Sequence, residues 1–150
     1  MKNFVVILLT TLLSAFFSHV FAYEPEQIKD GQRVPNDKSQ AATVRGDPKA
    51  IAKLIDDINA AVRTNKQRML SIIVINTDVA GSTLEREKTE TGLTFGDVYV
   101  AHSLALATKK KFSAIVALHK SGKTWADIAK AHGVTLKGSS ELIKEMQKQG

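Results

Sequence analysis

Three histidines in the second half of the chain, His102, His119 and His132, have the side chains best suited to proton transfer or metal binding. No two of them are four residues apart, the spacing that places two histidines on one face of a helix for zinc. The sequence also contains no cysteine, so it offers no thiolate ligand, no thiol nucleophile and no disulfide. We therefore expect neither a metal site nor a bound cofactor.

Asp97 and Asp127 could be paired acid–base carboxylates, but their surroundings assign them another role. Each follows a threonine, Thr94 or Thr124, by three residues. This is the pattern of a capping box, in which the hydroxyl and the carboxylate bond to free N–H groups at the start of a helix. No serine lies in a nucleophile elbow, and the sequence has no glycine-rich phosphate loop. The sequence therefore names no catalytic residue and favours a protein without enzymatic activity.

Lysines form the best candidate for a surface that binds an anion or a partner. Residues 99–150 carry nine basic and three acidic side chains, whereas residues 23–98 carry eleven and twelve. A basic half suggests an anionic partner such as nucleic acid, a lipid headgroup, an acidic polysaccharide or an acidic protein. The alternative is a solvated surface that only aids solubility. The candidate binding residues are Lys109, Lys110, Lys111, Lys120 and Lys123.

The elements that must position these side chains are predicted to be helices. Asp47 and Pro48 form a strong helix start, and Ser82 with Glu85 marks another as a third capping box. Residues 69–75 are ambiguous, because their β-branched content favours a strand while no second strand is evident to pair with it. We expect a helix there, with a strand as the alternative. The expected helices cover residues 48–65, 67–76, 82–90, 95–108, 113–121, 125–132 and 139–148.

Two segments resemble each other and indicate an internal repeat. Residues 94–102 match residues 124–132. Upstream of these segments, Thr77 aligns with Thr108. Such units bury their apolar faces by packing together. The sequence therefore predicts an all-α fold, a small bundle of about five to seven short helices built from two related helix-turn-helix units. Chance similarity between two capped helices is the alternative.

Residues 123–135 also look like the first helix and turn of a DNA-binding helix-turn-helix. Ala129 and Gly133 have the separation that this motif uses. The apolar residue expected six positions after the turn glycine is replaced by Ser139. The helix that follows also lacks the Arg, Asn or Gln cluster that reads base edges. Nucleic-acid binding is therefore kept only as an alternative.

The first 22 residues are predicted to be an export signal. Lys2 supplies the positive start, residues 4–17 are apolar and uncharged, and Val20 and Ala22 are small residues before a cleavage site. Cleavage between Ala22 and Tyr23 would leave a chain that begins at Tyr23. An uncleaved membrane anchor is the alternative, although the stretch is shorter than the ~20 apolar residues of a span.

We accordingly divide the chain into a signal peptide (1–22), a flexible leader (23–46) and an all-helical domain (47–150). The leader is polar and is interrupted by prolines and a glycine, so it can bury little surface. The signal predicts a protein of the bacterial periplasm or of the medium outside the cell.

Residues 69–134 resemble a loosely defined group of small exported bacterial proteins without an established activity. The shared pattern has a threonine before a turn (Thr77), then a glycine-aromatic-glycine-acid helix start (92–97). It closes on Gly-x-x-Trp-x-x-Ile-Ala (122–129). Lys109 departs from the pattern, which has a glycine there. The resemblance implies a bacterial origin and an all-helical fold, and it transfers no catalytic residue.

The function that these observations favour is a non-enzymatic binding or interaction role in the cell envelope, through the basic C-terminal part of the chain. The first alternative is an enzyme acting on an anionic envelope substrate, which would depend on His102 or His132. The second is a nucleic-acid-binding protein. No membrane span is expected after signal cleavage.

Overall fold

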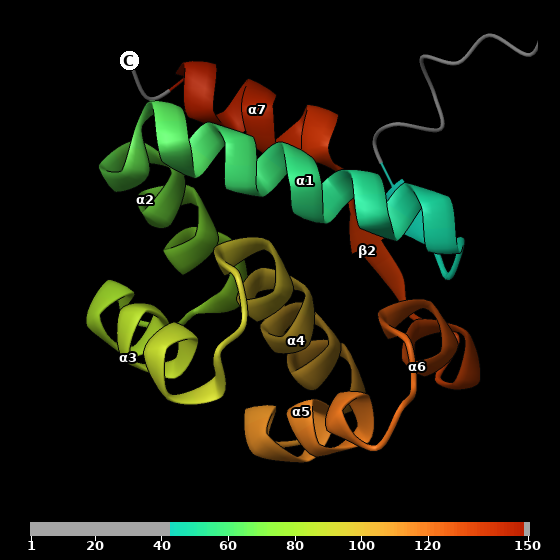
Figure 1. Cartoon of the computed structure of the whole chain (residues 1–150). Coiled ribbons are helices and arrows are strands. Elements are labelled where there is room, and N and C mark those ends of the chain that lie inside the picture. Colours follow the sequence, from blue (N-terminus) through green and yellow to red (C-terminus); the bar gives the residue numbers. More distant parts are fainter. Residues whose placement is uncertain (1–42, 149–150) are drawn as a thin grey trace, which may run out of the picture. The chain divides into compact units, whose positions relative to one another are not determined.

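The computed structural model describes residues 43–148, and helices make up most of this range (Figure 1). The predicted all-α fold class is confirmed, and each expected helix is present with bounds that differ by at most one residue. The helices are α1 (Pro48–Thr64), α2 (Lys66–Thr77), α3 (Gly81–Thr91), α4 (Phe95–Thr108), α5 (Phe112–Lys120), α6 (Trp125–Ala131) and α7 (Ser139–Lys148).

The central helix of the bundle is α4, which contacts α1, α2, α3, α5 and α6. Its sequence is apolar almost all round, and a helix of that kind is stable only when it is buried on every side. Tyr99, near its middle, is 1 % exposed, and burial raises the pKa of its phenol to about 12. Tyr99 therefore stays neutral and acts as part of the core.

The ambiguous segment 69–75 is helical, as expected, and forms most of α2. Met69, Ile72 and Ile73 are buried, whereas Ile75 is 61 % exposed. This spacing follows the helical period, since positions three and four apart share a face. The β-branched residues are thus accommodated in a helix because tertiary packing outweighs their weak intrinsic preference for strands.

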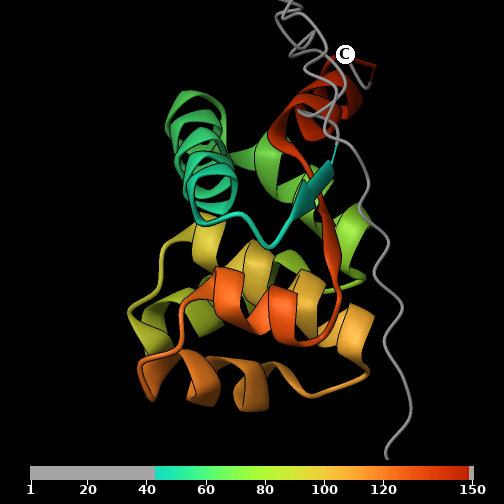
Figure 2. The same cartoon turned by 90° about the vertical axis from the view of Figure 1, so that its right-hand side faces the viewer.

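The prediction of a flexible leader over residues 23–46 is wrong at the C-terminal end of this range. Strand β1 (Thr43–Arg45) pairs antiparallel with β2 (Thr135–Lys137), and the two lie side by side in Figure 2. Val44 and Leu136 face each other in the register, and both are buried. Strands of three residues are too short for an alternating pattern to be recognised. The folded part therefore includes residues 43–46, while the rest of the leader lies outside the described residues.

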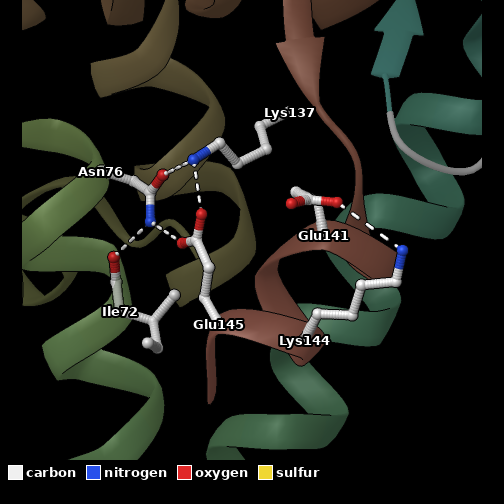
Figure 3. Close-up of polar contacts among 6 residues, drawn as sticks. All are labelled: Ile72, Asn76, Lys137, Glu141, Lys144 and Glu145. Atoms are coloured by element: carbon white, nitrogen blue, oxygen red, sulfur yellow. Dashed lines mark hydrogen bonds and ion pairs between the residues drawn. The ribbon is translucent and has the colours of Figure 1, made fainter. Parts of the chain in front are cut away.

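A polar network fastens α2, β2 and α7 together (Figure 3). Asn76 of α2 donates to Glu145 of α7 over 2.8 Å, and Lys137 of β2 donates to Asn76 over 2.6 Å and to Glu145 over 2.7 Å. The hydrogen bonds from Asn76 and Lys137 hold the pKa of the Glu145 carboxyl below its usual value. The short strand β2 is thereby tied to both α2 and α7.

Because its folded pKa is lowered, ionised Glu145 stabilises the fold fully above its unfolded pKa, near 4.5. That contribution is lost as the pH falls through the lower folded value. We expect Glu145→Gln to reduce the free energy of unfolding at pH 7 and to differ less from wild type at pH 3. Urea unfolding at both pH values measures this. Glu141→Gln is the control, because Glu141 of the same helix makes only a long contact of 3.8 Å with the exposed Lys144. Equal losses of stability at pH 7 and pH 3 for Glu145→Gln would contradict the prediction.

Candidate ligand-binding site

The two aspartates act as helix caps. Thr94 with Asp97, and Thr124 with Asp127, each form both bonds of a capping box, as predicted. In each box the threonine N–H donates to the carboxylate over 3.1 Å. Hydrogen bonding to Thr124 lowers the pKa of Asp127.

The third predicted capping box, Ser82 with Glu85, is wrong. Helix α3 begins one residue earlier, at Gly81, so Ala80 is at the N-cap and makes no side-chain cap bond. Ser82 lies inside the first turn instead of before it. Glu85 pairs with Lys66 of α2 over 2.6 Å, which gives its carboxylate a different partner.

Asp97 has a second role that the sequence did not indicate. Its Oδ2 accepts from Thr94, while its Oδ1 accepts from the indole Nε1 of Trp125 over 2.9 Å. Trp125 is 5 % exposed and belongs to the core cluster, so its indole anchors the start of α6 in the core. One carboxylate therefore starts α4 and also fixes the first residue of α6.

An apolar groove of about 350 Å³ lies beside Trp125, between the first turns of α1 and the start of α6. Ile51, Ala52 and Ile55 of α1 form one side, and Trp125 and Ala126 of α6 form the other. The connection between α5 and α6 contributes the rim of the groove. A concave apolar surface with a few polar groups at its edge has the usual composition of a small-molecule site.

His119 and Lys123 are the ionisable residues among those that line this groove. The imidazole of His119 stacks on the indole of Trp125, with 3.9 Å between ring centroids and 14° between planes. Its Nδ1 lies 2.9 Å from the carbonyl oxygen of Lys123. A carbonyl can only accept, so Nδ1 carries the proton. The rim is therefore held by a hydrogen bond as well as by stacking.

The five predicted binding lysines do not form one cluster. Lys109 caps the end of α4 in the left-handed conformation, with φ 54°, and Lys111 is at the N-cap of α5. Lys120 ends α5 and Lys123 follows it. The nine residues of α5 separate these groups by about 13 Å at 1.5 Å per residue. Of the five, Lys123 alone lines the apolar groove.

None of these five lysines forms an ion pair with a carboxylate within residues 43–148. The carboxylates that do form ion pairs with lysine or arginine in that range contact Lys53, Lys66, Arg86, Lys137 and Lys144. Lys123 contributes only a weak electrostatic influence to the lowered pKa of Asp127, which is mainly caused by Thr124. The described structure thus has a basic region around α5 without neutralising partners.

His102 occupies a different environment from His132, with which the sequence aligns it. Its side chain is nearly buried in α4, Nε2 lies 2.5 Å from Oε2 of Glu87, and its ring stacks on Phe112 at 4.3 Å. His132 is exposed after the end of α6.

A second cavity of about 370 Å³, between α3 and α5, is lined by Glu87, Phe112 and Lys120 among others. Within residues 43–148, no group of three or more His, Asp or Glu side chains is placed to hold a metal ion.

Residues aligned by the predicted repeat have similar local geometry. Thr77 and Thr108 each donate to the carbonyl four residues earlier over 2.7 Å. The next residues, Asp78 and Lys109, are both left-handed, with φ 56° and 54°. In each unit a glycine with positive φ, Gly92 or Gly122, lies two residues before the capping threonine. A common origin for the two units stays a prediction.

The segment that resembles a DNA-binding helix-turn-helix is arranged differently after Gly133. Residues 135–137 form β2, so α7 begins at Ser139 and does not follow α6 through the three- or four-residue turn of that motif. Helix α7 also carries Glu145, which is bonded to Asn76 and Lys137. The local sequence similarity therefore does not extend to the arrangement of the two helices.

A search of known protein families, curated proteins and solved structures finds no match to this chain. The resemblance to small exported bacterial proteins stays a prediction from the sequence motifs. No described helix is both long enough and apolar enough to cross a membrane. The predicted signal peptide and its cleavage point, Ala22 and Tyr23, lie outside the described residues.

Proposed function

We propose that this is an exported, non-enzymatic binding protein of the bacterial cell envelope whose partner is anionic. Its N-terminal sequence and its basic C-terminal part support this proposal. The proposed contact surface consists of α5 and the turns at its two ends. It contains all five lysines that the sequence indicated.

The observation that carries the proposal is the absence of ion pairs around α5 in the described part of the chain. Four lysines elsewhere in the described fold form ion pairs with carboxylates, and for Lys53 and Lys66 the carboxylate oxygen lies within 2.7 Å. The α5 lysines instead retain their charge for a partner in solution. A charged surface of this kind accelerates association with anions and depends strongly on salt.

A non-enzymatic role is supported by the structural contacts that the acidic side chains make. Asp97 and Asp127 are bonded at helix starts, and Glu145 is bonded in the network of Figure 3. Glu87 contacts His102 beneath the second cavity. These carboxylates therefore have structural contacts that account for their positions.

We expect the combined substitution of Lys109, Lys110 and Lys111 by alanine to lower the salt concentration that elutes the protein from a phosphorylated matrix. The control replaces Lys53, Lys66 and Lys144 by alanine. It removes the same number of charges, but from lysines that are already paired. The control should elute closer to wild type. Equal elution of the two triple variants would show that total charge decides retention and would contradict the proposed surface.

The partner and location can be tested on the full chain in cells. Crosslinking followed by mass spectrometry should recover an envelope component, and fractionation should place the protein in the periplasm or the medium. Recovery from the cytoplasm with nucleic acid would contradict the proposal.

A further inference from the structure

The apolar groove beside Trp125 exists because the first turns of α4 and α6 approach α1 differently. Gly96 of α4 donates from its N–H to Asn59 of α1 over 3.0 Å. A Cβ at this glycine would lie 2.5 Å from the carbonyl oxygen of Ile55, so α4 touches the α1 backbone directly. The aligned residue of α6 is Ala126, and there a groove separates the two helices. The fold thus leaves an open apolar space at the second of two related contacts.

The residues that line the groove include groups that can be positively charged and none that can be negatively charged. The walls are aliphatic or aromatic, while the ionisable groups at the rim, His119 and Lys123, can carry only positive charge. No carboxylate is among the lining residues. Asp127, on the adjoining first turn of α6, is bonded to Thr124 and does not line the groove. An apolar group with an anionic end therefore complements this lining.

The groove is suited to a small ligand and not to a protein. Its volume of about 350 Å³ is near the lower end of small-molecule sites. A stable protein interface needs more than about 1,000 Å² of complementary surface with an apolar centre. Among residues 43–148, the large hydrophobic side chains that are strongly exposed are Ile75 and Leu106, and neither lines the groove. The apolar surface thus ends where the groove ends.

We propose that this groove binds the acyl chain of an anionic amphiphile, with Lys123 contacting its charged headgroup. This inference deepens the proposed function, because it assigns a chemical class to the anionic partner. The acyl chain would lie against Ile51, Ile55 and the Trp125 indole, and burial of its methylene groups would supply most of the affinity. The positive charge at the rim would select an anionic headgroup over a cationic one.

Trp125 is the only tryptophan of the chain, so its fluorescence reports directly on the groove. The protein is titrated below the micellar concentration with decanoate, with decyltrimethylammonium, and with acetate as a headgroup without a chain. We expect a saturable emission change with decanoate, a several-fold weaker response to the cationic amphiphile, and none with acetate. An equal response to both amphiphiles, or no saturable response to decanoate, would overturn the inference. A groove that is already filled by another part of the chain or by a protein would also give no saturable response to decanoate.

Two variants test the site itself. Lys123→Ala should weaken decanoate binding about two- to fivefold, the range expected for an exposed ion pair. Lys130→Ala removes the same charge from an exposed residue of α6 that lies outside both the groove and the proposed basic surface, and it should bind like wild type. Ala52→Phe fills the groove from the exposed face of α1 and should abolish binding without loss of helical circular dichroism. Unchanged binding by a folded Ala52→Phe variant would overturn the inference.

Failure of this inference is distinguishable from failure of the proposed function. Lys109, Lys110 and Lys111 do not line the groove, so their replacement tests the basic surface alone. Ala52→Phe keeps every lysine and tests the groove alone. Equal elution of the two triple variants, together with saturable decanoate binding, would refute the surface and keep the groove.

Discussion

Gly96→Ala is expected to destabilise the domain by about 2–3 kcal/mol, although alanine is the better helix former. The added Cβ would lie 2.5 Å from the carbonyl oxygen and 2.8 Å from the Cα of Ile55. Both atoms belong to the α1 backbone, so no side-chain rotation can relieve the overlap. Helix α4 would have to move away from α1 and weaken the bond from Gly96 to Asn59. Urea unfolding followed by circular dichroism measures the loss.

Gly81→Ala is the matched control for this prediction. Gly81 is also in the first turn of a helix, and a Cβ there would meet only Val74 Cγ2 at an ordinary 3.9 Å. We expect Gly81→Ala to be neutral or to stabilise the protein by up to about 1 kcal/mol. If Gly96→Ala behaved in the same way, the close approach of α4 to α1 would be wrong.

Asp97→Ala is expected to lower the free energy of unfolding by about 2–4 kcal/mol. The helix start of α4 would lose its capping box, which costs about 1 kcal/mol. The buried indole N–H of Trp125 would also lose its acceptor, and an unpaired buried donor costs about 1–3 kcal/mol. The emission spectrum of Trp125 should change in the folded state, because its hydrogen bond is lost.

Asp127→Ala separates the two contributions. Asp127 caps α6 in the same way, but within residues 43–148 its carboxylate accepts from Thr124 and not from a tryptophan. We expect a smaller loss of stability than for Asp97→Ala and an unchanged Trp125 spectrum. A loss from Asp127→Ala as large as that from Asp97→Ala would show that capping alone explains both values.

The helices were predictable because their signals are local. Asp47 with Pro48, and Thr94 with Asp97, mark helix starts within four residues of sequence, and the structure contains both caps. The pairing of β1 with β2 was not predictable, since it joins Val44 to Leu136 across most of the domain. The failure at Ser82 has a similar cause. A capping pattern is outweighed when the preceding turn sets the helix start elsewhere and a distant lysine takes the carboxylate.

The candidate site was predictable only in part. The basic character of the α5 region follows from counting lysines, and Lys123 does lie at the groove. The groove itself combines Ile51 and Ile55 of α1 with Trp125 of α6, residues that are adjacent only after folding. The bond from Trp125 to Asp97 is equally nonlocal. Its one sequence signal is the alignment of Phe95 with Trp125, which places both aromatics at the same position of related helices.

The pairing of β1 with β2 has a consequence for the order in which the domain can be completed. Thr43 pairs with Lys137, so the first described strand acquires its partner only after almost the whole domain has been synthesised. Helix α7, which packs on α1 and α2, comes later still. Contacts between distant parts of a chain form slowly because the intervening loop must close first. A nascent chain that ends before residue 135 contains α2, α4 and α6, on which α1 packs, but it lacks the partner of β1 and the helix that packs on α1 and α2 from the C-terminal end.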